Sequence, residues 1–174
     1  MKGYFSFVFL VLFLFPLVET KAQVRLQLTA ALESSKTTDS LYNSLDAVKN
    51  KTGLTTGYMA ALQALKAVHA WNPYSKVKHL NRSEETFKRA VAADPHNLEI
   101  RFMRFSVEHH VPGFLGYNKN LESDRKEIIH QLKQKNYTSA DQDLVNTVVQ
   151  FLIDSKRCTP AENEYLNRHL VAYQ

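Results

Sequence analysis

The chain has almost no cysteine, since Cys158 is the only one among its 174 residues. A single thiol excludes every intramolecular disulfide, so the apolar core alone must stabilise the fold. No neighbouring pattern marks Cys158 as a catalytic thiol. We therefore expect this residue to be buried near a helix end, to be free, or to form an intermolecular bridge.

Glycine is also scarce, and the five glycines are scattered along the chain. The motifs Gly-x-Ser-x-Gly, Gly-x-x-x-x-Gly-Lys and Gly-x-Gly-x-x-Gly, which position nucleophiles or phosphates, do not occur. The seven histidines form no His-Glu-x-x-His pattern, and the adjacent His109 and His110 would point about 100° apart on a helix. We expect a non-catalytic protein with neither a metal nor an organic cofactor. An enzyme whose site is assembled from separated helices stays open as an alternative.

Long apolar runs are missing except at the N-terminus. A short positive segment, Met1-Lys2, precedes residues 4–18, which are apolar apart from one serine and one proline, and Thr20-Lys21-Ala22 follows. This order is typical of a secretory signal peptide. We predict a signal peptide over residues 1–22 and an exported domain, periplasmic or secreted, over residues 23–174. The alternative is an uncleaved membrane anchor, which needs about 20 apolar residues.

Charge of one sign is nowhere concentrated, although 22 basic and 17 acidic side chains give a net charge of +5. Such dispersed charge is typical of a solubilising surface. Because an exported domain does not meet nucleic acid inside the cell, we expect no nucleic-acid partner. The positive balance leaves open a structural envelope component that contacts an anionic membrane or polysaccharide surface.

Strand patterns are absent as well, because no segment after residue 22 combines alternating apolar residues with hairpin turns. Apolar residues instead recur at helical spacing in segments separated by turns. The helices that this spacing predicts begin near residues 24, 39, 57, 81, 98, 121, 139 and 160. We predict one all-α domain of about seven or eight helices, stacked as a bundle or a short repeat-like array.

Capping signals set two of these boundaries. Thr159 and Glu162, with a proline directly after the threonine, predict a helix start in which the two side chains cap each other's amides. Asn81 and Glu84 have the same spacing and predict another helix start. We expect a polar linker over residues 73–80 before it, after a helix that the Asn-Pro pair ends.

Residues 87–97 resemble the second helix and exit turn of a tetratricopeptide repeat. Phe87 occupies the family's aromatic position, Ala90 its small position and Pro95 its closing turn. With the alanine-rich helix before it, the resemblance spans about residues 57–97. It implies binding of a protein or peptide in a concave groove without catalysis, whereas an ordinary helical hairpin with a proline turn is the alternative.

The predicted helix over residues 98–110 is apolar around most of its circumference. Arg101, Arg104 and Glu108 form its one narrow polar stripe, which we expect to face water. The planar guanidinium of arginine suits a partner's carboxylate, so these three residues are candidate partner contacts. Alternatively, Arg104 and Glu108 pair with each other across solvent.

The loop over residues 112–117 is the most distinctive local segment because it combines two glycines with apolar and aromatic residues. We expect it to pack down as a plug that seals the bundle. A recognition loop at the mouth of a groove is the alternative, and it makes Phe114 and Tyr117 candidate partner contacts. The leading hypothesis is thus an exported helical interaction module that binds a protein or peptide.

Overall fold

The computed structural model describes residues 21–171 of the chain. Every regular element in this range is helical, with eight α-helices and one short 3-10 helix, so the predicted all-α class is confirmed. The predicted signal peptide lies outside the described residues except for Lys21 and Ala22, which begin the first helix. Export therefore stays a prediction, and cleavage after Ala22 would remove the first two residues of that helix.

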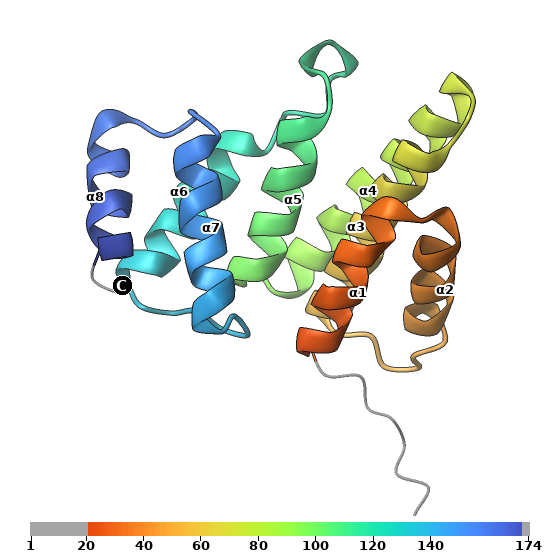
Figure 1. Ribbon diagram of the computed structural model, residues 1–174, viewed down its shortest axis with the longest axis horizontal. Coiled ribbons are helices and arrows are strands. Elements are labelled where there is room, and N and C mark those ends of the chain that lie inside the picture. Colours follow the sequence, from red (N-terminus) through yellow and green to blue (C-terminus); the bar gives the residue numbers. More distant parts are fainter. Residues whose placement is uncertain (1–20, 172–174) are drawn as a thin grey trace, which may run out of the picture.

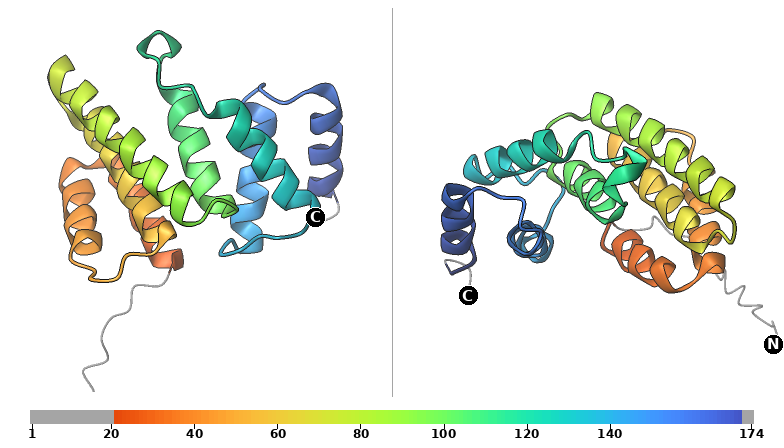
Figure 2. Two further views of the ribbon diagram at one scale, coloured as in Figure 1. Left: turned by 180° about the vertical axis from the view of Figure 1, so that it is seen from behind. Right: turned by 90° about the horizontal axis from the view of Figure 1, so that it is seen from above.

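Successive helices run antiparallel to one another (Figure 1). Seen from above, α4 and α6 lie along one side of the molecule, α1 and α7 along the other, and α5 between these two rows (Figure 2). Between residues 21 and 171, no helix is both long and apolar enough to cross a bilayer. The elements are α1 (Lys21–Glu33), α2 (Ser35–Asp46), α3 (Gly53–His69), α4 (Pro73–Ala93), α5 (Leu98–His110), η1 (Gly113–Leu115), α6 (Leu121–Lys133), α7 (Gln142–Asp154) and α8 (Pro160–Val171).

Buried apolar side chains form two clusters, and α5 contributes to both. The first cluster combines side chains of the N-terminal region, α1 to α4, with Ile100 and Met103 of α5. The second combines side chains of the C-terminal region, α6 to α8, with Leu98 and Phe105 of α5. Helix α5 therefore joins the two regions by burying opposite parts of its surface in each, as its broad apolar face predicted.

Helices α3 and α4 pack closely because small side chains lie between them. Ala60 is fully buried, and its carbonyl oxygen accepts a hydrogen bond of 2.8 Å from Ser83 Oγ on α4. On another side of α3, a Cβ atom added to Gly57 would lie only 3.0 Å from Met103 Cε on α5. Small residues on α3 thus allow two neighbouring helices to approach its backbone.

The predicted capping box at the start of α8 is confirmed. The Thr159 amide donates to Glu162 Oε2 at 2.7 Å, and the Glu162 amide donates to Thr159 Oγ1 at 3.3 Å. Each side chain satisfies an amide that the first helical turn would otherwise leave without a partner.

The predicted helix start at Asn81 and the linker before it are wrong, because α4 already begins at Pro73. Asn72 caps this helix by accepting a 2.7 Å hydrogen bond from the Ser75 amide, and proline fits the first turn because no intrahelical partner awaits its missing N–H. Asn81 and Glu84 consequently lie in the middle of a 21-residue helix. The Asn-Pro pair both follows one helix and begins the next.

Two further helices begin about four residues earlier than predicted, at Ser35 and Gly53. Ser34 and Thr52 are their caps, and each accepts a hydrogen bond from the amide three residues later. Thr38, just before the predicted start near residue 39, is buried inside α2 and donates to the Ala31 carbonyl at 2.8 Å. It therefore fastens α2 to α1.

Candidate functional site

The polar stripe of α5 is not exposed, so the expectation that it faces water is wrong. Arg104 and Glu108 are only 8% and 7% exposed. Helix α6 covers the stripe with Asp124, which is fully buried and accepts hydrogen bonds from Arg101 Nη1 at 2.8 Å and from Arg104 Nε at 2.7 Å. Both arginines therefore bind α6. Their role as contacts for a partner stays a prediction, and this geometry does not favour it.

Glu108 holds the start of α6 rather than pairing with Arg104. Its carboxylate accepts hydrogen bonds from the Asn120 amide at 2.8 Å and from Asn120 Nδ2 at 2.6 Å. Burial raises the pKa of Glu108, while the two bonds from Asn120 oppose the increase. The carboxylate of Glu108 is thus engaged inside the fold, as the arginines are.

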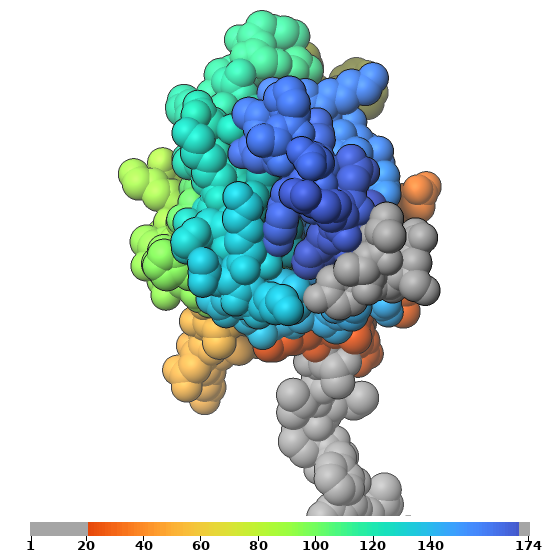
Figure 3. All heavy atoms as spheres, turned by 90° about the vertical axis from the view of Figure 1, so that its left-hand side faces the viewer, coloured from red at the N-terminus to blue at the C-terminus, as the bar shows by residue number. Residues whose placement is uncertain are grey.

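The loop after α5 projects away from the bundle, so the predicted plug is wrong. It stands above the other helices in Figure 1 and forms the uppermost surface in Figure 3. Phe114 at its tip is 88% exposed. The base of the loop is held, since Tyr117 Oη donates to Asn81 Oδ1 at 2.5 Å and Lys119 Nζ lies 3.0 Å from Glu84 Oε1. The geometry agrees with the alternative, a recognition loop, whose function stays a prediction.

A trough between α1 and α7, with α5 as its floor, is the candidate site. It has a volume of about 450 Å³ and is open to solvent. Leu26 on its α1 wall is 73% exposed, while Phe102 and Leu144 are partly buried. Its lining residues are Ala22, Arg25, Leu26, Leu28, Thr29, Tyr58, Glu99, Phe102, Met103, Asp141, Asp143, Leu144 and Thr147.

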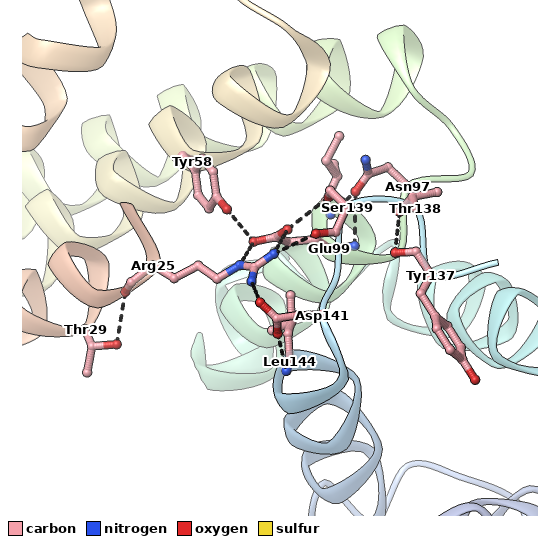
Figure 4. Close-up of polar contacts among 11 residues, drawn as sticks. Arg25, Thr29, Tyr58, Asn97, Glu99, Tyr137, Thr138, Ser139, Asp141 and Leu144 are labelled. Atoms are coloured by element: carbon pink, nitrogen blue, oxygen red, sulfur yellow. Dashed lines mark hydrogen bonds and ion pairs between the residues drawn. The ribbon is translucent and has the colours of Figure 1, made fainter. Parts of the chain in front are cut away.

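A polar cluster lies at the base of the trough and ties its walls to its floor (Figure 4). Arg25 of α1 donates through Nε and Nη2 to the two carboxylate oxygens of Glu99 on α5, at 2.7 and 2.9 Å. Arg25 Nη1 also donates to Asp141 Oδ2, at the start of α7, at 2.5 Å. Tyr58 Oη and Ser139 Oγ complete the shell by donating to Glu99 at 2.5 and 3.1 Å.

The electrostatics of this cluster fix which groups carry charge. Hydrogen bonding to Glu99 raises the pKa of Arg25, so the guanidinium stays protonated. Burial, and then the charge of Glu99, raise the pKa of Tyr58, so its hydroxyl remains a donor. The Leu144 amide lowers the pKa of Asp141, so this carboxylate stays ionised in neutral solution. Arg25 is shared by Glu99 and Asp141, and Asp143 also lines the trough, so acidic side chains outnumber basic ones there.

Sequence reasoning missed the trough because its residues are far apart along the chain. Arg25 and Glu99 are 74 residues apart, and Arg25 and Asp141 are 116 apart. No local spacing connects them. The one available signal is Glu99, a charged residue in the first turn of α5 that lies outside the polar stripe of Arg101, Arg104 and Glu108, and its side chain is only 2% exposed. A buried carboxylate requires a partner, and that requirement points to a distant cation.

The other reactive groups form no comparable site within residues 21–171. Cys158 lies one residue before the cap of α8, and burial raises the pKa of its thiol to about 11, which keeps it protonated. It is a partly buried, free thiol near a helix end, which combines the first two predicted options, and an intermolecular bridge stays a prediction. In the part of the chain that the structure describes, no three His, Cys, Asp or Glu side chains are grouped as metal ligands.

Comparisons with models of protein families, with curated proteins and with solved structures find no match to this chain. The resemblance to a tetratricopeptide repeat therefore rests on the residues that suggested it. Phe87 and Ala90 are both buried in the N-terminal cluster, and Pro95 lies in the turn between α4 and α5. Membership of that family stays a prediction.

Proposed function

We propose that the chain is an exported, non-catalytic interaction module that binds a peptide segment of a partner protein in the trough of α1, α5 and α7. The observation that carries the proposal is the combination of an open trough with a pre-formed polar cluster at its base. A groove whose polar groups are already held by one another loses little conformational entropy when a ligand binds.

The lining of the trough suggests which peptide fits. Exposed and half-buried apolar side chains, among them Leu26, Phe102 and Leu144, provide surface that a ligand would remove from water. Three carboxylates and one guanidinium line the trough, although the chain as a whole has a net charge of +5. We expect the ligand to be an apolar segment that carries lysine or arginine, because a basic ligand is attracted by this local acidic excess.

A selection from a random peptide library tests the proposal. The bait is the protein, and the selected peptides are then measured for binding by fluorescence anisotropy. We expect apolar sequences that contain lysine or arginine, with binding that weakens as salt increases. Leu26→Ser and Asp143→Lys should each weaken binding about tenfold, because each changes an accessible trough side chain and leaves the Arg25–Glu99 pair in place.

Matched control variants lie on the same helices outside the trough. Leu32→Ser on α1 and Asp154→Lys on α7 change exposed residues of the same types and should bind as the wild type does. If the selected peptides bind all four variants equally, the trough is not the site. A failure to select any peptide that binds specifically contradicts the proposal of a peptide-binding module.

A further inference from the structure

The three most exposed large apolar residues of the described chain are all aromatic. Trp71 is 97% exposed, Phe114 is 88% exposed and Tyr74 is 80% exposed. Trp71 and Tyr74 lie at the turn between α3 and α4, where Val68 is also 63% exposed. None of these side chains supports the core, so the fold does not account for their apolar character.

These aromatic residues lie on two projections at the same end of the molecule. The α3–α4 turn and the loop after α5 both extend upward in Figure 1, and the reverse view in Figure 2 agrees. The contacts of Tyr117 with Asn81 and of Lys119 with Glu84 attach the loop to α4. The two projections are therefore held in a fixed relation, which allows them to meet one extended surface together.

Basic residues predominate in the segment that contains the α3–α4 turn, up to Glu84 and Glu85 on α4. Residues 66–83 contain Lys66, Lys76, Lys78 and Arg82 and no aspartate or glutamate. Lys66 pairs with Asp39, whereas Lys78 and Arg82 are exposed. Burial, followed by the charges of Arg82, Lys66 and Lys78, lowers the pKa of His79, in agreement with a positive local potential.

We propose that this aromatic and basic end, Trp71, Tyr74 and Phe114 with Lys78 and Arg82, docks on the surface of an anionic lipid bilayer. The rings of tryptophan and tyrosine favour the interface between lipid and water, because one edge is apolar and the other is polar. Lysine and arginine beside them are attracted to anionic headgroups. Separate protruding rings suit a planar interface, which needs no complementary pocket. This site is distinct from the trough and does not depend on the proposed peptide.

Trp71 supplies its own reporter, since it is the only tryptophan of the full chain. Residues 1–22 contain none, so an interaction of that apolar run with lipid is silent in tryptophan fluorescence. We expect the emission of Trp71 to shift to the blue with vesicles that mix phosphatidylglycerol with phosphatidylcholine, and brominated lipids to quench it. Vesicles of phosphatidylcholine alone should give a much smaller shift, because the electrostatic attraction is missing.

Two pairs of variants test the two parts of the surface. The double variant Tyr74→Ala, Phe114→Ala keeps Trp71 as the reporter. It should bind anionic vesicles about tenfold more weakly, or weaker still, because two rings no longer insert into the interface. Lys78→Glu with Arg82→Glu should do the same and remove most of the salt dependence. The controls Leu32→Ala with Val48→Ala, and Lys36→Glu with Lys49→Glu, alter exposed apolar and basic residues elsewhere and should retain binding.

The outcomes separate the proposal from its alternatives. If anionic vesicles bind the full chain without a blue shift or quenching of Trp71, contact occurs elsewhere and the proposal is wrong. If heparin binds as strongly as the vesicles and the aromatic variants bind like wild type, the surface recognises polyanions and not a bilayer. Peptide binding in the trough is measured separately, so its failure leaves this result unaffected.

Discussion

The N-terminal region packs its helices through small residues, whereas the C-terminal region packs through branched and aromatic ones. Four alanines of α3 are buried, and the α4 side chain of Ser83 reaches the backbone of Ala60. In contrast, α6 and α7 bury isoleucine, leucine and valine, and Phe151 packs edge-on against Phe105 with ring centroids 6.1 Å apart. The first region is therefore sensitive to added volume, and the second to volume removed.

The polar contacts of α5 also differ between the side that faces α6 and the side that faces the trough. Toward α6, Arg101 and Arg104 share the fully buried Asp124, so this contact lies inside the C-terminal region. Toward α1 and α7, Glu99 binds Arg25 at the base of an open trough. One cluster supports the fold alone, while the other also shapes a surface that a ligand can reach. That difference explains why the candidate site lies on one side of α5 and not on the other.

Asp124→Ala should have the largest effect, because it removes the acceptor of two arginines and leaves the guanidinium of Arg104 buried without a counter-ion. Breaking one partner of a buried ion pair costs about 3–5 kcal/mol of the free energy of unfolding. Urea denaturation followed by circular dichroism measures this loss. Glu122→Ala on the same helix changes an exposed carboxylate and should stay within about 0.5 kcal/mol of wild type. Equal stability of the two variants would contradict the role of Asp124.

Ala60→Leu should destabilise the protein by about 1–3 kcal/mol, because the added carbons have no space between α3 and α4. Ala92→Leu on α4 adds the same atoms at an exposed position and should be close to neutral. Thermal unfolding of both variants checks the difference. A harmless Ala60→Leu would show that the N-terminal region is packed more loosely than its burial indicates.

The sequence predicted where helices form better than it predicted which helices pack together, and particular residues show why. The start of α8 follows from Thr159 and Glu162 because both capping partners lie within one turn. The start of α4 was missed because an Asn-Pro pair satisfies the rules for ending a helix and for beginning one. Local signals are sufficient where one interpretation satisfies them and ambiguous where two do.

Long-range contacts account for the errors at the candidate site. Helical periodicity correctly placed Arg101, Arg104 and Glu108 on one face, but it carries no information about the helix that covers that face. The apolar composition of the loop suggested burial, yet Phe114 is exposed. The trough depends on Arg25 meeting Glu99 across 74 residues, which no local pattern contains.

Thr159→Ala and Thr52→Ala should each cost about 1 kcal/mol by removing a helix cap, one in each region. Thr159→Ser and Thr52→Ser keep the capping oxygen and serve as matched controls. Hydrogen exchange measured by mass spectrometry locates the change. We expect both variants to lower protection in both regions, because α5 is buried in both clusters and couples them. Protection lost in only one region would show that the two unfold separately.

The smallest expected effect is on the pH dependence of stability. It compares His79 of the N-terminal region with His109 of α5, which packs against Phe151 of the C-terminal region. Burial lowers the pKa of His79 on α4, and the charge of Arg82 lowers it further. Burial also lowers the pKa of His109 on α5, followed by the charge of Arg157. In the unfolded chain each histidine has its ordinary pKa of 6.5 and takes up a proton more readily. The stability that each neutral ring provides is therefore fully present above about pH 6.5 and is lost as the pH falls through the lowered pKa.

His79→Gln and His109→Gln should each reduce the stability lost between about pH 7.5 and about pH 5.5, because neither glutamine takes up a proton. His79 Nδ1 lies 3.2 Å from Gln63 Oε1, and a glutamine amide can also donate there, so packing changes little. His109 stacks on Phe105, so His109→Phe is a second variant that keeps a ring without the charge. Urea unfolding at both pH values gives the difference for each variant. A variant that loses as much stability as wild type between the two pH values shows that its histidine is not a source of the acid sensitivity. If only one of the two histidines contributes, the burial that lowers the histidine pKa differs between the two sites.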